Sequence, residues 1–79
     1  MAYYFSGTIG GKQMTLPFAF TVSDINQMNA GESVTLDGIS ATQTSGSITQ
    51  NSNGTYTVND RLCLEGYYNE TVVGTLSQN

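Results

Sequence analysis

Charged side chains are scarce in this sequence. Of its 79 residues, two are Lys or Arg, six are Asp or Glu, and none is histidine. General acid–base catalysis and zinc binding both depend on titratable or ligating side chains, and a chain with so few of them is poorly equipped for either. We therefore expect a protein that is not an enzyme and that uses no cofactor and no metal.

Positive charge is the scarcest of all, because Lys12 and Arg61 are the only cations and the net charge is −4. Proteins that bind nucleic acid neutralise several phosphates with Lys or Arg, which two scattered cations cannot do. An anionic membrane surface would repel the chain, and no segment approaches the ~20 apolar residues that span a bilayer. We expect neither a nucleic-acid partner nor a membrane.

Cys63 is the single cysteine, so no disulfide can form within the chain. A domain of this length buries only roughly 60% of its unfolded surface and commonly needs a further source of stability. Self-association or a well-formed closed sheet could supply it. The first five residues lack the basic and apolar segments of a signal peptide. Two locations are therefore compatible with the sequence: the protein is cytoplasmic, or it is a mature secreted or virion protein.

Alternating apolar residues are the clearest positive signal. They predict strands with one face in a core, because side chains on a strand point alternately to opposite faces. Residues 3–9 and 13–22 follow this pattern on either side of Gly10 and Gly11, which predicts a β-hairpin with a glycine turn. Pro17 has no N–H to donate and should lie at an edge or a bulge. The apolar positions are Tyr3, Phe5, Ile9, Met14, Leu16, Phe18, Phe20 and Val22.

Residues 23–30 break the alternation. Ser23 is suited to an N-cap, Asp24 to the first turn and Gly31 to the position after the last turn, which predicts one or two helical turns. Ile25 and Met28 are spaced so that both could face the core.

The remaining sequence consists of short apolar–polar runs separated by turn residues. We expect turns at 44–46, 51–54 and 59–60, and a turn or a bulge at 37–38, where Gly, Asn, Asp and Ser gather. Turns at this spacing are typical of small all-β folds. The sequence predicts one domain, residues 1–79, that is all-β: a small antiparallel sandwich or barrel of about seven short strands with one short helical turn near 23–30.

The carboxylates and the cysteine are weak candidates for chemistry. Glu65 and Glu70 flank a predicted turn, but solvated carboxylates on a β-domain usually maintain solubility. Asp37 and Asp60 fall in predicted turns, where Asp commonly caps its own backbone. Cys63 has no histidine to activate it, and we interpret it as a small, partly buried thiol.

Tyrosines are the best candidates for a binding surface. Tyr3 and Tyr4 lie near one end of the chain, and Tyr67 and Tyr68 near the other. In an adjacent pair on a strand one ring must face outward, so Tyr4 and one of Tyr67 and Tyr68 should be exposed. If the first and last strands are neighbours, the exposed rings could form one patch. The candidate interface residues are Tyr3, Tyr4, Tyr67, Tyr68, Asn69 and Arg61.

Three roles remain open for these tyrosines: covering a thin core, contacting a partner, and stacking on a sugar or nucleobase. The composition favours a small non-catalytic β-domain that acts by protein–protein contact, including self-association. The alternative is a small-ligand binder, either a carbohydrate-binding module or a soluble sponge for a nucleotide or metabolite, with neutral ligands suiting the tyrosines best.

Overall fold

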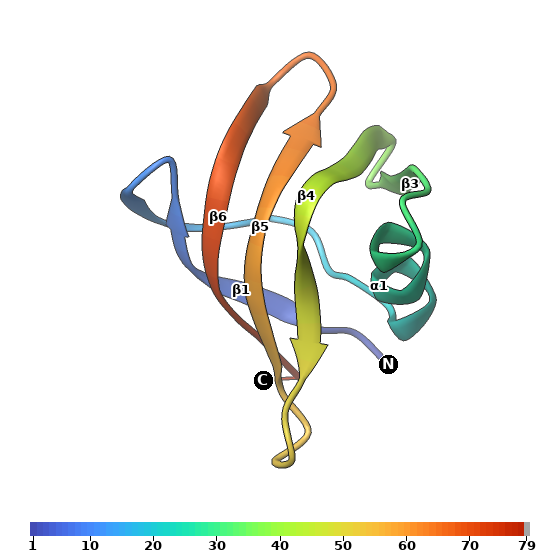
Figure 1. Cartoon of the computed structure of the whole chain (residues 1–79), viewed down its shortest axis with the longest axis vertical. Coiled ribbons are helices and arrows are strands. Elements are labelled where there is room, and N and C mark those ends of the chain that lie inside the picture. Colours follow the sequence, from blue (N-terminus) through green and yellow to red (C-terminus); the bar gives the residue numbers. More distant parts are fainter. Residues whose placement is uncertain (79) are drawn as a thin grey trace.

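The computed structural model describes residues 1–78, and these form one curved antiparallel sheet and one helix (Figure 1). The sheet has six strands in the order β2-β1-β6-β5-β4-β3. The elements, in chain order, are β1 (Tyr4–Ile9), β2 (Lys12–Thr15), α1 (Val22–Asn29), β3 (Val34–Leu36), β4 (Ile39–Gln50), β5 (Tyr56–Leu64) and β6 (Tyr68–Ser77).

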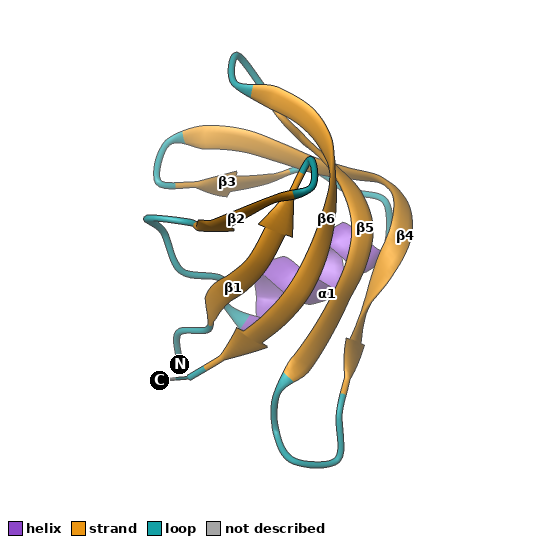
Figure 2. Ribbon diagram, turned by 90° about the vertical axis from the view of Figure 1, so that its left-hand side faces the viewer, coloured by secondary structure: helices purple, strands orange, loops and turns teal. Residues whose placement is uncertain are grey.

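The sheet bends around one side of α1 but does not close on itself (Figure 2). Its two end strands, β2 and β3, are not paired with each other in the described part of the chain. The predicted all-β class and the single short helix are confirmed. The sheet has six strands where about seven were predicted, and the predicted sandwich or barrel is replaced by an open sheet whose concave face is filled by α1 and the segment before it.

The predicted hairpin is confirmed, but its second strand is short. Gly10 and Gly11 have φ values of 60° and 81°, as a tight hairpin turn requires. β2 then ends at Thr15, two residues before Pro17, which cannot donate to a ladder. Phe18 and Phe20 are buried nonetheless, and Phe20 pairs with Tyr3 as an isolated bridge. The alternation over 13–22 therefore marks burial only at its centre, because Met14 and Val22 at its two ends are each 41% exposed, and it marks a strand only up to Thr15.

The predicted helix is confirmed as α1. Its N-cap is Thr21 rather than Ser23: the Thr21 hydroxyl accepts from the Asp24 N–H at 3.0 Å, and the Asp24 carboxylate accepts from the Thr21 N–H at 2.9 Å. This reciprocal pair is a capping box and fixes where the helix starts. Ile25 and Met28 are each 1% exposed and anchor the helix in the core.

Two predicted turns are wrong. Residues 44–46 lie within the continuous strand β4, where a register shift between Gln43 and Ser45 absorbs an extra residue as a bulge. Residues 59–60 lie within β5, which alternates buried and exposed positions up to Cys63. In both places cross-strand pairing overrides a local turn preference. The turns at 37–38 and 51–54 are confirmed, with φ values of 50° at Asp37 and 80° at Gly38.

The core lies on the concave face of the sheet. It joins the inward side chains of β1, β4, β5 and β6 to Phe18, Phe20 and the buried side of α1. The convex face carries mainly Ser, Thr and Asn, for example Thr57, which lies between Thr49 and Thr75 on the neighbouring strands. The one charged residue among the described buried positions is Asp60.

Candidate functional site

The tyrosines proposed as an interface do not form one patch. β1 and β6 are neighbours, which was the condition for such a patch, but they are antiparallel, and Tyr4 lies opposite Ser77. Tyr68 is at the other end of β6, nine residues away, which is about 30 Å along a strand. Tyr4 and Tyr67 are exposed, at 46% and 71%, as the alternation predicted for Tyr4 and for one of the later pair. Tyr3 is buried, and its ring packs almost perpendicular to the Tyr56 ring, with the two ring centroids 5.1 Å apart.

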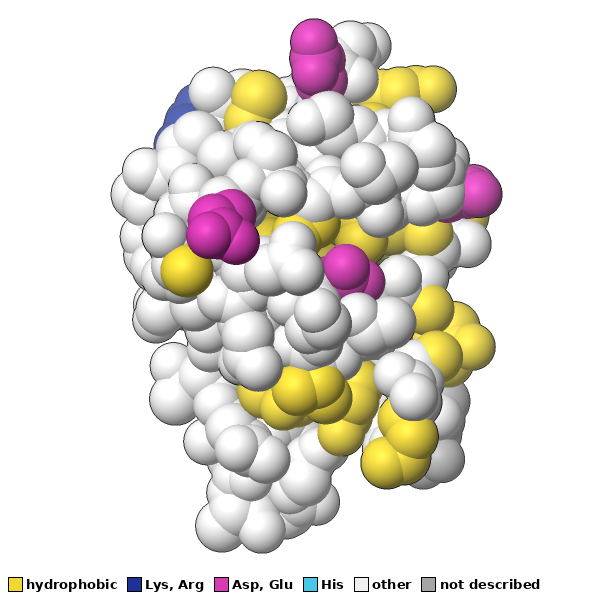
Figure 3. Space-filling model, turned by 90° about the vertical axis from the view of Figure 1, so that its right-hand side faces the viewer, with side chains coloured by type: hydrophobic (Ala, Val, Ile, Leu, Met, Phe, Trp, Pro, Cys, Tyr) yellow, Lys and Arg dark blue, Asp and Glu magenta, His cyan; other side chains and the backbone are white. Residues whose placement is uncertain are grey.

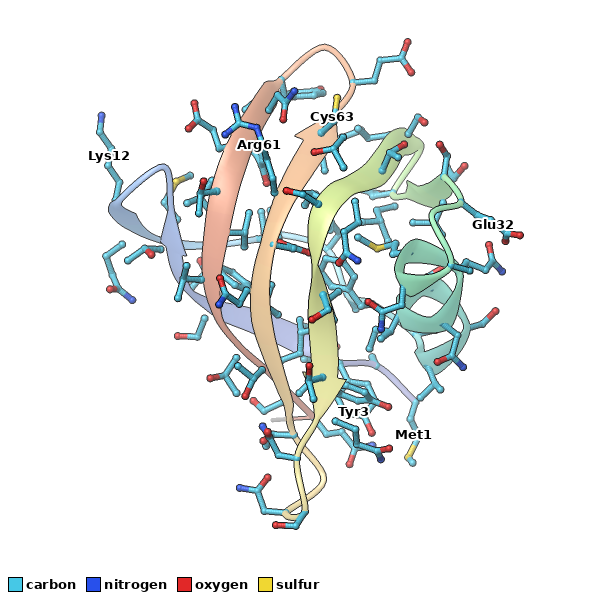
Figure 4. All side chains as sticks on the ribbon, viewed as in Figure 1. Met1, Tyr3, Lys12, Glu32, Arg61 and Cys63 are labelled. Carbon is cyan, nitrogen blue, oxygen red and sulfur yellow. The ribbon has the colours of Figure 1, made fainter. Side chains whose placement is uncertain are left out.

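Arg61 and Asn69 are close together on the convex face near the later tyrosines. The Arg61 Nη2 atom donates to the Asn69 carbonyl oxygen at 2.8 Å, which fixes the guanidinium across β5 and β6. Cys63 is half-buried beside them and is paired with Asn69 in the sheet. Figure 4 shows Arg61 and Cys63 at the end of the sheet where β5 turns into β6, far from Tyr3.

A groove lies on the concave side, where the end of β2 and the segment after it approach the β3–β4 and β5–β6 turns. Its volume is about 410 Å³. Sequence reasoning identified Tyr67 and Tyr68 as candidates but not the rest of the lining, because the lining comes from segments far apart in the chain. The lining residues are Met14, Thr15, Leu16, Pro17, Phe18, Asp37, Ile39, Leu64, Tyr67 and Tyr68.

Asp60 is buried among apolar side chains instead of capping a turn. It occupies an inward position of β5 and is 5% exposed. It borders a cavity of about 10 Å³ with neighbours such as Phe5, Met28 and Val72. Its Oδ1 atom has no hydrogen-bond partner among the described residues. Burial disfavours the charged carboxylate and raises the pKa of Asp60 from 3.8 to about 7.

Tyr68 also carries a buried polar atom without a partner in the described chain, as do Asp60 and Gln43. Its hydroxyl is buried and makes no hydrogen bond within residues 1–78. Burial raises the pKa of Tyr68, and the negative charge of Asp60 raises it further. The period-two alternation through β5 was the available signal for Asp60, but the Asn-Asp pair had been interpreted as a turn.

The free edge of β2 presents unpaired backbone groups. The Gly10 N–H donates to the Thr71 carbonyl at 2.9 Å, so the even-numbered residues of β1 direct their hydrogen bonds toward β6 and the odd-numbered residues toward β2. Lys12 and Met14 lie opposite the odd-numbered Ile9 and Gly7. Antiparallel ladders alternate, so the backbone groups of Gln13 and Thr15 face outward, away from the sheet.

Comparison of the chain with protein-family models, curated proteins and solved structures gives no match. Within the described residues, no three or more His, Cys, Asp or Glu side chains gather closely enough to hold a metal ion. The helix of the described chain is too short and too polar to cross a bilayer.

Proposed function

We propose that this protein is a small non-catalytic β-domain that acts by protein–protein contact, and that its first partner is a second copy of itself. The contact is an antiparallel pairing of β2 with β2 of the second copy, which joins two open sheets into one continuous sheet. The observation that carries the proposal is the row of outward backbone groups on Gln13 and Thr15 at an edge that nothing in the described chain covers.

The alternation of the ladder selects one register for this pairing. Because Gln13 and Thr15 carry the outward groups, the best two-fold arrangement places Gln13 of each copy opposite Thr15 of the other, with four backbone hydrogen bonds. Met14 of one copy then lies directly opposite Met14 of the other. Met14 is 41% exposed, and the pairing would shield its side chain from water. The arrangement uses the same surface on both copies, as a closed two-fold dimer requires.

Charge also favours this edge. The net charge of −4 disfavours close approach of two copies, but β2 contains no carboxylate and carries Lys12 at its start. In the proposed register Lys12 lies opposite Leu16 of the second copy, so no like charges meet across the axis.

The other surfaces of the chain are less suited to such a contact. Asn29 occupies part of the outer edge of β4 through hydrogen bonds to Ile48. On the side of the molecule with α1 and β3, apolar side chains reach the surface in separate groups between polar ones rather than as one broad patch (Figure 3). The edge of β2 therefore offers the better interface.

The alternative of a sugar or nucleotide ligand receives less support. Sugar sites are expected to combine aromatic rings with amide side chains, and nucleotide sites need positive charge. The lining of the groove contains no Asn, Gln, Lys or Arg. A neutral sugar ligand stays a prediction from the tyrosine content alone.

Sedimentation velocity over a wide range of concentrations tests the proposal. We expect the wild-type chain to shift from monomer to dimer as its concentration rises. Gln13→Pro removes one outward N–H without removing a bond to β1, and we expect it to weaken dimerisation strongly. Gln13→Thr keeps the N–H and is the matched control. A chain that stays monomeric at every concentration, or a proline variant that dimerises like the wild type, would overturn the proposal.

A further inference from the structure

The groove between the end of β2 and the two neighbouring turns has an unusual composition. Three aromatic residues, Phe18, Tyr67 and Tyr68, contribute to its lining, and Asp37 is the one charged residue in it. Lys12 and Arg61, the two cations of the chain, do not line it. The site thus combines aromatic side chains, aliphatic side chains and a single negative charge.

This combination is suited to one class of ligand. Aromatic faces attract cations through the ring quadrupole, and sites that collect several rings recognise quaternary ammonium groups. A primary ammonium has three N–H donors that need acceptors, whereas a quaternary ammonium has none. The groove offers few acceptors, since its side chains are mostly apolar and the Tyr68 hydroxyl is buried. A cation that needs no hydrogen bonds fits this lining better than one that does.

We propose that the groove binds a small quaternary ammonium compound with an apolar body. Asp37 balances the charge, the aromatic side chains contact the methyl groups, and the apolar body lies against Leu16, Ile39 and Leu64. The volume of about 410 Å³ is large enough for such a molecule. The proposal does not depend on dimerisation, because the ligand contacts assigned to Phe18, Asp37 and Tyr67 lie outside β2, although Met14 and Thr15 of β2 also line the groove.

Two of these residues can be changed with little risk to the fold. Asp37 has a φ of 50°, a conformation that Asn tolerates well, so Asp37→Asn removes the charge and keeps the turn. Tyr67 is 71% exposed, so its ring contributes little to the core. Tyr67→Leu removes the aromatic face and keeps an apolar side chain, while Tyr67→Phe keeps the face and is the matched control.

The experiment is an NMR titration of the full chain with benzyltrimethylammonium, with choline, and with the neutral tert-butyl analogue of choline. We expect saturable shifts of the Asp37 and Tyr67 amides with both cations, stronger with benzyltrimethylammonium because choline has no apolar body, and binding of the neutral analogue much weaker than that of choline. Asp37→Asn and Tyr67→Leu should each weaken binding about 2- to 5-fold, and Tyr67→Phe should bind like the wild type.

Three results would overturn the proposal. They are the absence of saturable shifts with either cation, equal binding of choline and its neutral analogue, and wild-type affinity in the Tyr67→Leu variant. Equal binding of the neutral compound would assign the groove to apolar ligands in general. The titration is repeated with Gln13→Pro, which should bind the cations unchanged, so that a failure of dimerisation and a failure of ligand binding are seen separately.

Discussion

Asn29 binds the backbone of Ile48 with both ends of its side-chain amide. Its Nδ2 atom donates to the Ile48 carbonyl at 2.7 Å, and its Oδ1 atom accepts from the Ile48 N–H at 3.0 Å. The amide thus takes the place of a neighbouring strand on the part of β4 that extends beyond its pairing with β3. The last turn of α1 covers an edge that would otherwise be open to another chain.

Asn29→Ala should lower the free energy of unfolding by about 1–3 kcal/mol, because it leaves two partly buried backbone groups without partners. Urea denaturation followed by circular dichroism measures the loss. Asn26→Ala is the control, since Asn26 is exposed on the same helix and alanine favours helix formation. Equal stability of the Asn29 variant and the wild type would contradict the proposed role of the amide.

Asp60 should make the stability of the protein depend on pH. Its pKa is about 7 in the folded chain and near 3.8 in the unfolded chain, so the folded state holds the proton more tightly. The unfolded state loses its proton first as the pH rises. The contribution of Asp60 to the free energy of unfolding should therefore be most favourable below pH 3.8. It should fall between pH 4 and pH 7 and level off above pH 7.

Asp60→Asn removes the ionisation and keeps the shape of the side chain. At pH 8 we expect the variant to be more stable than the wild type by a few kcal/mol, because each unit of pKa shift corresponds to about 1.4 kcal/mol. At pH 4 the two should be nearly equal. Denaturation curves over this pH range provide the measurement, and parallel pH profiles of the two proteins would show that Asp60 is not a buried carboxyl.

Gly46 should be irreplaceable where it pairs with Asp60, just after the bulge of β4. Its φ is 79°, and a Cβ atom there would lie 2.6 Å from the Asp60 Cα on β5. Gly46→Ala should therefore cost more than about 2 kcal/mol, adding a backbone clash to the cost of the left-handed conformation.

Gly54→Ala is the matched comparison for Gly46. Gly54 has a similar φ of 87°, but nothing lies within 4 Å of its added Cβ, so only the conformational cost of about 1 kcal/mol is expected. Thermal unfolding of both variants separates the cost of the backbone clash from the cost of the left-handed conformation. Equal melting temperatures would mean that β4 and β5 do not approach closely at the Gly46–Asp60 pair.

Sequence reasoning predicted the turns and the helix whose conformation depends on neighbouring residues in the chain. The glycine turn after Ile9, the helix with its buried Ile25 and Met28, and the turn before Thr55 all follow from conformational preference and spacing. The contact between the first and last strands, which was considered only as a condition for a tyrosine patch, is present.

The features that sequence reasoning missed depend on pairing between distant segments. Gly46 resembles a turn residue, and only the pairing of β4 with β5 shows that it lies within a strand, opposite Asp60 and just after a bulge. Asp60 resembles a turn cap, and only its place on the inward face of β5 shows that it is buried. The groove combines residues from three regions of the chain, so Phe18 and Asp37 could not be linked to Tyr67 in advance.

The most direct test of the proposed dimer is a disulfide across its two-fold axis. In a Cys63→Ser background, Met14→Cys would place two sulfurs on residues that face each other in a closely spaced pair, with Cα atoms about 4.5 Å apart. We predict that mild oxidation converts this variant to a covalent dimer. Gln13→Cys in the same background should form little covalent dimer, because the new thiol at position 13 would lie opposite Thr15 of the second copy and not opposite a second cysteine. Equal cross-linking of both variants, or of neither, would contradict the pairing of β2 with β2.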